Sequence, residues 1–323
     1  MITSLLFVSL RCVSMRKFKV AITIRSFGLN IYEKNEFAEK FEILYRNTTG
    51  RRLSERELSQ VLRGVEGVIA GTEPFTKEVI ESLSDLKVIS RVGVGVDSID
   101  LETARKYGIK IMNTPEAPVQ AVAEHTLALI LDLLKHIATY NQKMRAKDYS
   151  IEPGQILSGK QIGIVGLGRI GYRVAMLLAA FGCKINYYDP WVKIRVPDEW
   201  QSDSTLDQLL MKSDIVSLHL PPQENGKPLL DEISLKLIKK GAIIINTARG
   251  SLIDEESLCK ALLSGQIGGA GLDVFSVDPY TGPLLKYPQV IATPHVASNT
   301  LESRNQMEIE AVHNLITAIK EEP

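Results

Sequence analysis

The sequence predicts an α/β protein with two doubly wound domains, each built on a parallel β-sheet. Short runs rich in β-branched residues alternate with amphipathic helical segments along the whole chain. Such alternation is typical of parallel sheets that are covered by helices on both faces. A chain of 323 residues is also long for one compact core, so two domains are expected.

The expected strands fall into two series, which predict two separate sheets. The first series has five strands, at Lys19–Ile24, Glu42–Arg46, Gly67–Ala70, Lys87–Arg91 and Lys110–Met112. The second series has six strands, at Gln161–Val165, Lys184–Tyr188, Ile215–Leu218, Ala242–Asn246, Ala270–Asp273 and Val290–Ala292. Amphipathic helices are expected between strands, at Glu55–Leu62, Lys77–Leu83, Ile170–Phe181 and Glu255–Leu263.

The segment between the two series contains a turn at Asn113–Pro115 and a long apolar helix at about Val119–His136. The chain ends in another helical pattern, Leu301–Ile319, after a break at Thr293–His295. If this last helix returns to the first domain, that domain is discontinuous and the second is inserted into it. Periodicity alone does not prove this connection.

The charges balance, with 38 basic and 38 acidic residues. This neutral total does not favour a nucleic acid or an anionic membrane as partner. The three cysteines are far apart and form no CxxC or Cys/His cluster, so we expect no metal site and a reducing, cytoplasmic location.

Residues 1–14 are expected to be a loose extension, with a weak signal peptide as the alternative. The apolar run Leu5–Leu10 has no positive region before it and is too short to span a bilayer. No other segment of the sequence is a candidate transmembrane helix.

The strongest local motif is Gly166–Gly171, with the sequence GLGRIG, directly after an expected strand and at the start of an expected helix. Gly166 would permit a tight turn, Gly168 would let a diphosphate approach the backbone, and Gly171 would let the helix pack close to the strand. The motif in this context predicts a dinucleotide site, although glycine-rich turns also occur as plain structural turns.

Arg169 and Ile170 would begin the helix whose N-terminal N–H groups face the diphosphate. Asp189 follows eighteen residues after Gly171, at the end of the next strand. A carboxylate there accepts hydrogen bonds from the adenosine ribose and repels a 2′-phosphate, which favours NAD over NADP.

Two further polar residues follow later strands, at the edge where such sheets bind ligands. Arg249 comes after Ala242–Asn246, and a guanidinium suits a substrate carboxylate. His295 comes after Val290–Ala292, and an imidazole suits proton exchange with a substrate oxygen. Taken singly, each could equally be a surface arginine or a histidine packed in a loop.

At these residues the sequence resembles the D-isomer-specific 2-hydroxyacid dehydrogenases, most closely the branch of D-3-phosphoglycerate dehydrogenase and its relatives. The resemblance covers about Lys19 to Ile319. The motifs that carry it are Arg91–Asp97, Asn113–Pro115, Val122–Thr126, Gly166–Gly171, Asn246–Gly250, Leu272–Phe275 and Thr293–His295.

The resemblance implies a flavodoxin-like catalytic domain, formed by residues 15–114 and 296–323, and an inserted Rossmann NAD-binding domain, formed by residues 115–295. It also implies a homodimer, with the helix that carries Glu124 and His125 at its interface.

The same resemblance implies roles for individual residues. Arg249 would orient the substrate, His295 would be the acid/base, and amides near Val94 and Gly95 would hold the substrate carboxylate. The residues expected along the cofactor, beyond the glycine motif and Asp189, are His219, Thr247 and Asp273, the last of them at the nicotinamide amide.

Two departures from the family pattern bear on mechanism and substrate. Asp278 stands where members normally carry the glutamate that polarises the histidine, and its alternative role is that of an Asp-Pro turn residue. The stretch Ala70–Pro74 carries Glu73 and no basic residue, which weakens an assignment to a phosphorylated substrate.

These observations predict an NAD-dependent oxidoreductase for a small D-2-hydroxy or 2-keto acid. Its candidate substrates are 3-phosphoglycerate and, as the alternative, glyoxylate or hydroxypyruvate. The rival class is an NAD-sensing binding protein without turnover.

Overall fold

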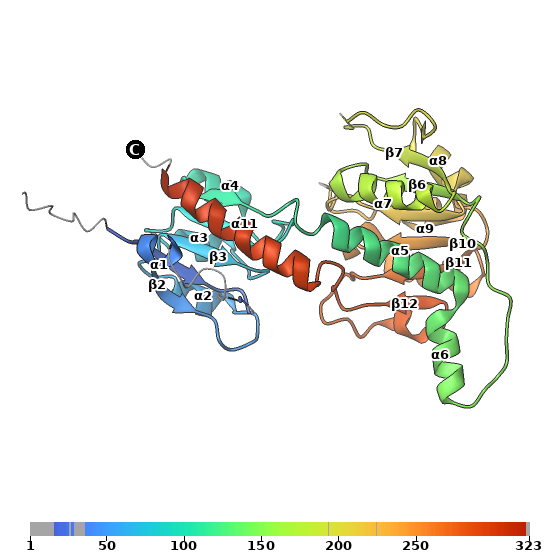
Figure 1. Ribbon diagram of the computed structural model, residues 1–323, viewed down its shortest axis with the longest axis horizontal. Helices are drawn as coiled ribbons and strands as arrows, with labels where there is room; N and C mark the ends of the chain where they lie inside the picture. Colours follow the sequence, from blue (N-terminus) through green and yellow to red (C-terminus); the bar gives the residue numbers. More distant parts are fainter. Residues whose placement is uncertain (1–15, 26, 29–35, 193, 224, 321–323) are drawn as a thin grey trace, which may run out of the picture. The chain divides into compact units, whose positions relative to one another are not determined.

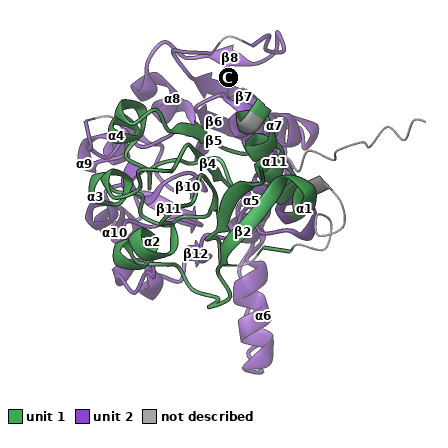
Figure 2. Cartoon of the chain, turned by 90° about the vertical axis from the view of Figure 1, so that its left-hand side faces the viewer, with its two compact units in different colours: residues 1–114, 305–323 green, residues 115–304 purple. Residues whose placement is uncertain are grey.

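The computed structural model describes residues 16–25, 27–28, 36–192, 194–223 and 225–320. The chain divides into two compact units, coloured separately in Figure 2. Unit 1 comprises Met1–Thr114 and Asn305–Pro323, and unit 2 comprises Pro115–Arg304. The expected extension at residues 1–14 lies outside the described residues.

Unit 1 is built on a five-stranded parallel sheet with the strand order β2-β1-β3-β4-β5. Its strands are β1 (Phe18–Ile22), β2 (Phe41–Arg46), β3 (Gly67–Ala70), β4 (Val88–Arg91) and β5 (Lys110–Met112). The helices between them are α1 (Glu36–Lys40), α2 (Glu55–Val61), α3 (Lys77–Glu81) and α4 (Leu101–Lys106).

The last helix, α11 (Leu301–Lys320), begins just before the boundary at residue 305 and contributes most of its length to unit 1. Its Ala311 carbonyl accepts a hydrogen bond of 2.8 Å from the buried hydroxyl of Ser90 on β4. Ala311, Val312 and Leu315 on this helix are fully buried. The helix therefore closes one face of the sheet in unit 1.

Unit 2 is built on a seven-stranded parallel sheet with the order β12-β11-β10-β9-β6-β7-β8. Its strands are β6 (Gln161–Val165), β7 (Lys184–Tyr188), β8 (Gln201–Ser202), β9 (Ile215–Leu218), β10 (Ala242–Asn246), β11 (Ile267–Leu272) and β12 (Val290–Ala292).

Two helices of unit 2 precede β6 and the others lie between the strands. These helices are α5 (Val119–Lys135), α6 (Ile137–Arg145), α7 (Arg169–Ala180), α8 (Leu206–Lys212), α9 (Glu232–Leu237) and α10 (Glu255–Leu263), with short 3₁₀ turns at η2 (Gly250–Leu252) and η3 (Pro283–Lys286). Helix α10 is labelled in Figure 2 and the other α-helices in Figure 1.

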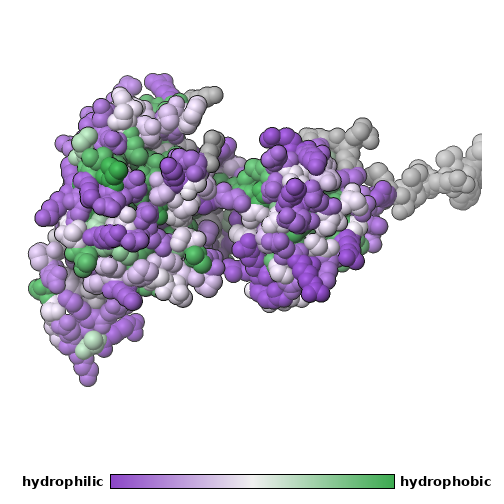
Figure 3. Space-filling model, turned by 180° about the vertical axis from the view of Figure 1, so that it is seen from behind, coloured by the Kyte–Doolittle hydropathy of each residue, from purple (hydrophilic) through white to green (hydrophobic). Residues whose placement is uncertain are grey.

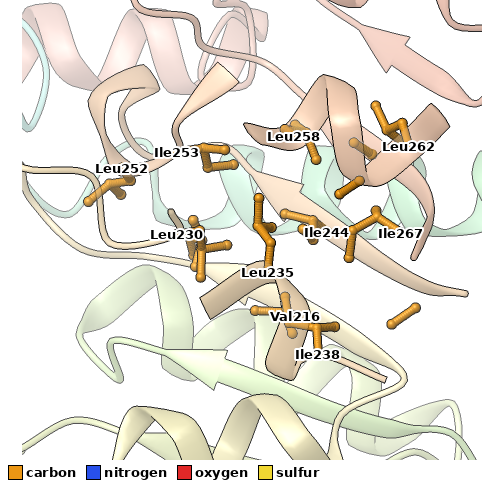
Figure 4. Close-up of a cluster of buried hydrophobic side chains, with 14 of the residues drawn as sticks. Val216, Leu230, Leu235, Ile238, Ile244, Leu252, Ile253, Leu258, Leu262 and Ile267 are labelled. Atoms are coloured by element: carbon orange, nitrogen blue, oxygen red, sulfur yellow. The ribbon is translucent and has the colours of Figure 1, made fainter. Parts of the chain in front are cut away.

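Apolar side chains cover both faces of the sheet in unit 2. On one face, residues from α9, α10 and the strands form the cluster in Figure 4, which includes Leu235, Ile244 and Leu258. On the other face, Ile130 of α5 and Val174 of α7 belong to a second cluster, together with Ile164 of β6. This two-sided burial explains why the central strands are continuous apolar runs rather than alternating ones.

The predicted fold class, two parallel α/β sheets, is confirmed. One strand was missed, since β8 has only two residues and both are exposed. Residues 296–304, which the sequence assigns to the first domain, group with unit 2. The physical reason is that the amides of Val296 and Ala297 bond to Asp273 in unit 2.

None of the helices in the described part of the chain is long and apolar enough to cross a bilayer. Figure 3 shows one face of the molecule, on which hydrophilic residues predominate and hydrophobic residues appear in scattered patches.

Candidate active site

The glycine turn, Gly166–Gly171, connects β6 to α7 in unit 2. Gly166 has a φ of +90°, and a Cβ on it would lie 2.6 Å from the carbonyl oxygen of His219. A Cβ on Gly171 would lie only 2.0 Å from the carbonyl oxygen of Gly166. Both positions therefore require glycine because of the protein's own backbone.

Gly168 differs from the other two glycines of the turn. It is exposed, its φ is −71°, and a Cβ on it would meet no atom within 4 Å. No protein contact therefore requires glycine here. Open space at the N-terminus of a twelve-residue helix, next to a position without a side chain, fits the diphosphate of a dinucleotide.

Arg169 and Ile170 begin α7, as expected for the helix that faces the diphosphate. The Arg169 guanidinium is exposed, and its Nε donates to the carboxylate of Glu116 in the same unit. This contact holds Arg169 beside the turn.

Asp189 follows β7 and lies next to the glycine turn. Its Oδ2 accepts a hydrogen bond of 2.8 Å from the backbone N–H of Leu167, and its Oδ1 accepts one of 2.8 Å from the N–H of Trp191. The half-buried carboxylate is therefore fixed in orientation by the turn itself. Each oxygen can still accept a second hydrogen bond, as a ribose hydroxyl requires.

His219 and Thr247 follow β9 and β10, at the same edge of the sheet as the glycine turn. The His219 Nε2 lies 2.8 Å from the Ser217 hydroxyl, and burial lowers the pKa of this imidazole to about 3. His219 is therefore neutral at physiological pH. The Thr247 hydroxyl lies 2.9 Å from that of Thr126 on α5.

A cavity of about 340 Å³ lies at the ends of β10, β11 and β12, and it brings Arg249, Asp278 and His295 together. The residues that line it all belong to unit 2 and are Arg249, Gly250, Asp273, Val274, Phe275, Val277, Asp278, Pro279, Tyr280, Leu285, Ala292, Thr293, Pro294 and His295. All three residues that the sequence predicts to be catalytic thus line one cavity.

Arg249 is positioned by a compact turn after β10. Its backbone carbonyl accepts a hydrogen bond of 2.8 Å from the Asn246 side chain, and its Nη1 donates to the Ala248 carbonyl at 2.7 Å. The next residue, Gly250, lies so close to Phe275 that a Cβ would be 2.0 Å from that residue's backbone. This close approach joins the turn of Arg249 to the chain after β11.

His295 lies in the histidine loop, Thr293–Ala297, which follows β12. Its φ of 55° is in the left-handed region, which residues other than glycine rarely adopt. Its backbone N–H donates to the Asp273 carbonyl at 2.8 Å. The chain that surrounds His295 therefore holds it in an unfavourable backbone conformation, which is a common feature of functional residues.

Asp273, expected at the nicotinamide amide, directs its carboxylate into the protein. The residue is fully buried. Its Oδ1 accepts hydrogen bonds from the Thr293 hydroxyl at 2.5 Å and from the Val296 N–H at 2.9 Å. Its Oδ2 accepts one from the Ala297 N–H at 2.8 Å. The carboxylate thus holds the histidine loop, and its expected contact with the nicotinamide amide stays a prediction.

Asp278 lines the cavity but is exposed. Among the described residues, no hydrogen bond or ion pair joins Asp278 to His295. The segment that carries Asp278 turns back on itself, since the rings of Phe275 and Tyr280 stack with centroids 4.2 Å apart. The side chain of an aspartate is one methylene shorter than that of a glutamate, so it reaches less far from this turn.

Val94 and Gly95 belong to unit 1, where they follow β4. The Val94 side chain is exposed, and its carbonyl accepts a hydrogen bond of 2.6 Å from the Asn113 side chain. In the same unit, the buried Glu73 carboxylate accepts a bond of 2.6 Å from the Gly71 N–H. Glu73 therefore stabilises its own loop by a local hydrogen bond, a role that the sequence pattern does not indicate.

The contacts of His125 on α5 were not predicted from the sequence. Its Nε2 lies 3.0 Å from the Thr293 hydroxyl and 3.6 Å from Asp273 Oδ1. A signal was present in the sequence, because Val122 and Leu129, at i−3 and i+4, lie on the buried stripe of the helix. A histidine on that stripe faces the sheet of its own unit.

Residues 127–297 match the family model described as "D-isomer specific 2-hydroxyacid dehydrogenase, NAD binding domain". The matched range contains the glycine turn, Arg249 and His295. The chain is 38% identical to a hydroxypyruvate reductase of Thermotoga maritima over 83% of this chain and 89% of that protein. It is 36% identical to a D-3-phosphoglycerate dehydrogenase of Bacillus subtilis, over 73% of this chain but only 46% of that protein.

The chain belongs to the D-isomer specific 2-hydroxyacid dehydrogenases. The structure of a glyoxylate reductase from Paecilomyes thermophila superposes with a TM-score of 0.85 at 29% identity, covering 95% of this chain and 97% of that one. This dehydrogenase is therefore an NAD-dependent enzyme, and the expectations of enzyme class and cofactor are confirmed. Membership in this family disfavours the rival hypothesis of an NAD-sensing binding protein without turnover.

Proposed function

We propose that this dehydrogenase reduces a small, unphosphorylated 2-keto acid of the glyoxylate or hydroxypyruvate type. The observation that carries the proposal is that Arg249 and His295 line one cavity in the NAD-binding unit. NAD, once bound, supplies or accepts the hydride. The glycine turn and Asp189 would hold its diphosphate and ribose, and His219 and Thr247 would lie along it.

Arg249 would bind the substrate carboxylate with its guanidinium and so orient the carbonyl carbon. His295 would enter protonated and give its proton to the carbonyl oxygen as that oxygen gains negative charge. In the reverse direction, a neutral His295 would accept the hydroxyl proton of the hydroxy acid. Backbone amides near Val94 and Gly95 are proposed as further carboxylate donors.

The absence of phosphate on the substrate is proposed from the charges at the cavity. Arg249 is the one lysine or arginine among the residues that line it, and Asp278 adds a negative charge. A second anionic group on the substrate would be unfavourable beside Asp278. The polarisation of His295 by Asp278 stays a proposal, which requires the side chain to move toward the imidazole.

The test is NADH oxidation with a panel of glyoxylate, hydroxypyruvate, pyruvate and 3-phosphohydroxypyruvate. We expect glyoxylate or hydroxypyruvate to give the highest kcat/KM, and NADH to exceed NADPH by at least about tenfold because of Asp189. A clear preference for the phosphorylated acid would refute the substrate proposal, and equal use of NADPH would refute the role of Asp189.

Arg249→Lys provides a test of the carboxylate contact. Lysine keeps the charge but cannot reproduce the planar guanidinium, so KM for the keto acid should rise and kcat should fall. The affinity for NADH should change little. Normal keto-acid kinetics would place Arg249 outside the substrate site.

We also propose that the enzyme forms a homodimer through α6 and the segment that follows it. Helix α6 has no buried residue, whereas α5 buries a stripe of residues against its own sheet. Exposed apolar side chains follow along this region, at Ile137, Met144, Tyr149, Ile151 and Ile156. Light scattering should give twice the chain mass of 35.8 kDa, and Ile151→Lys should lower this measured mass.

A cytoplasmic location remains a proposal from the cysteine content.

A further inference from the structure

The carboxylate of Asp273 is fully buried, and three groups of the histidine loop donate hydrogen bonds to it. A buried carboxylate with these donors acts only as an acceptor. The basic side chain that the structure places against it is His125 of α5, with Nε2 at 3.6 Å from Oδ1. The proposed proton transfer from His295 to the substrate does not itself involve the contact between the α5 histidine and this buried carboxylate.

The hydroxyl of Thr293 connects the two groups and determines the direction of the hydrogen bonds. It has a single proton, which it donates to Asp273 Oδ1 at 2.5 Å. The same oxygen lies 3.0 Å from His125 Nε2, so it must accept from that nitrogen. His125 therefore carries a proton on Nε2, and the hydrogen bonds run from His125 to Thr293 to Asp273.

This chain of bonds acts on the loop that carries His295. Asp273 holds the residues on both sides of His295, through the Thr293 side chain and through the amides of Val296 and Ala297. Its carbonyl accepts from the N–H of His295 itself at 2.8 Å. With its φ of 55°, His295 would relax toward a more favourable conformation if these bonds were lost.

We propose that His125 is a positioning residue for His295, acting through Thr293 and Asp273. It contacts neither substrate nor cofactor, but it orients the Thr293 hydroxyl and partly compensates the buried charge of Asp273. The proposal rests on the proposed role of His295 as the acid that gives its proton to the substrate oxygen. The expected contact of Asp273 with the nicotinamide amide stays a separate prediction, because each carboxylate oxygen can accept more than one hydrogen bond.

The test uses isosteric changes in the full-length enzyme. Thr293→Val removes the hydroxyl and keeps the shape, whereas Thr293→Ser keeps the hydroxyl. His125→Leu removes the donor, whereas His125→Gln keeps an N–H donor near the position of Nε2. The matched control is Thr103→Val, a buried threonine on α4 of unit 1.

Thr293→Val and His125→Leu should each lower kcat for the keto acid by about tenfold, while KM for NADH stays within about twofold. The solvent isotope effect on kcat should rise, because a displaced His295 makes proton transfer slower relative to other steps. Thr293→Ser and His125→Gln should recover most of the rate. Thr103→Val should leave all three quantities unchanged.

Two outcomes would overturn the proposal while leaving the function intact, provided that His295→Ala is inactive. One is a normal kcat and isotope effect in folded Thr293→Val and His125→Leu. The other is a large rise in KM for NADH at unchanged kcat, which would show that these bonds serve cofactor binding by Asp273 rather than the position of His295. If His295→Ala keeps full activity, the proposed acid role and the positioning proposal fall together.

Discussion

The glycine turn after β6 and the histidine loop after β12 lie on strands of one sheet, but they are held by different means. The turn depends on glycines at positions where a side chain would collide with backbone, and its tightest contact joins Gly171 to Gly166, five residues earlier. The loop is held by Asp273, which lies about twenty residues before it, and by His125 from a helix in another part of the sequence. A local motif specifies the first, and tertiary hydrogen bonds specify the second.

This difference predicts which property a substitution in each region changes. A side chain added at Gly166 or Gly171 of the turn collides with backbone, so the effect there is on folding. A side chain changed in the loop leaves the fold but displaces a reacting group, so the effect is on rate.

The largest effect is expected for Gly171→Ala. Its Cβ would lie 2.0 Å from the Gly166 carbonyl oxygen, and backbone cannot move aside as a flexible side chain can. We expect a loss of about 3 kcal/mol or more in the free energy of unfolding, measured by urea denaturation, together with loss of NADH binding. Near-normal stability would show that the turn is less tightly determined than the contacts indicate.

His295→Ala should lower kcat for keto-acid reduction on the order of a hundredfold, the usual scale for removing a general acid. The free energy of unfolding should change little, because alanine keeps the hydrogen bonds of the loop backbone. Steady-state kinetics and urea denaturation measure the two quantities. Activity within a few-fold of the unmodified enzyme would exclude His295 as the acid.

Gly168→Ala tests the glycine of the turn that no protein contact requires. A Cβ there meets no protein atom, so stability should stay within about 0.5 kcal/mol. The affinity for NADH should nevertheless fall by about tenfold, since the methyl group would occupy the space proposed for the diphosphate. Calorimetric titration with NADH measures this, and unchanged affinity would place the diphosphate elsewhere.

Asp278→Asn tests whether the exposed aspartate reaches His295 during the reaction. A nearby negative charge favours the protonated imidazole, so its removal should move the alkaline limb of the reduction profile to lower pH by up to about one unit. Asp278→Glu is the control, because the longer side chain should restore or strengthen the effect. A pH profile that does not move in either variant assigns Asp278 to its turn alone.

The smallest effect concerns His219, beside the glycine turn. Burial lowers the pKa of this imidazole to about 3, below its value of about 6.5 in an unfolded chain. As the pH falls, the unfolded state therefore binds a proton before the folded state does. The stability that this neutral imidazole contributes is lost as the pH falls from about 6.5 toward 3.

His219→Gln removes this titration and can still bond to Ser217. We expect the variant to lose at least about 1 kcal/mol less stability than the unmodified enzyme between pH 7 and pH 4.5, measured by urea denaturation at each pH. Equal losses in the two proteins would show that the imidazole is hydrated in the folded state.

The two-sheet fold, the glycine turn and the family could be predicted from the sequence. Each of these depends on local chemistry: strand and helix periodicities, positions where only glycine fits, and short motifs that follow strand ends. Ten of the eleven expected strands overlap observed ones within two residues, and Ala270–Asp273 marks only the later part of β11. The two-residue β8 was missed because it buries no side chain from which a pattern could arise.

The hydrogen-bond partners of the polar groups at the strand ends become visible only in the folded protein. The motif around Asp273 indicates a carboxylate at the active site, but not that it turns inward to hold the histidine loop. The helix pattern places His125 on a buried stripe, but not against Thr293, 168 residues away. Hydrogen bonds of this kind join side chains with no fixed spacing along the chain, so no periodicity or motif reveals them before the strands are assembled.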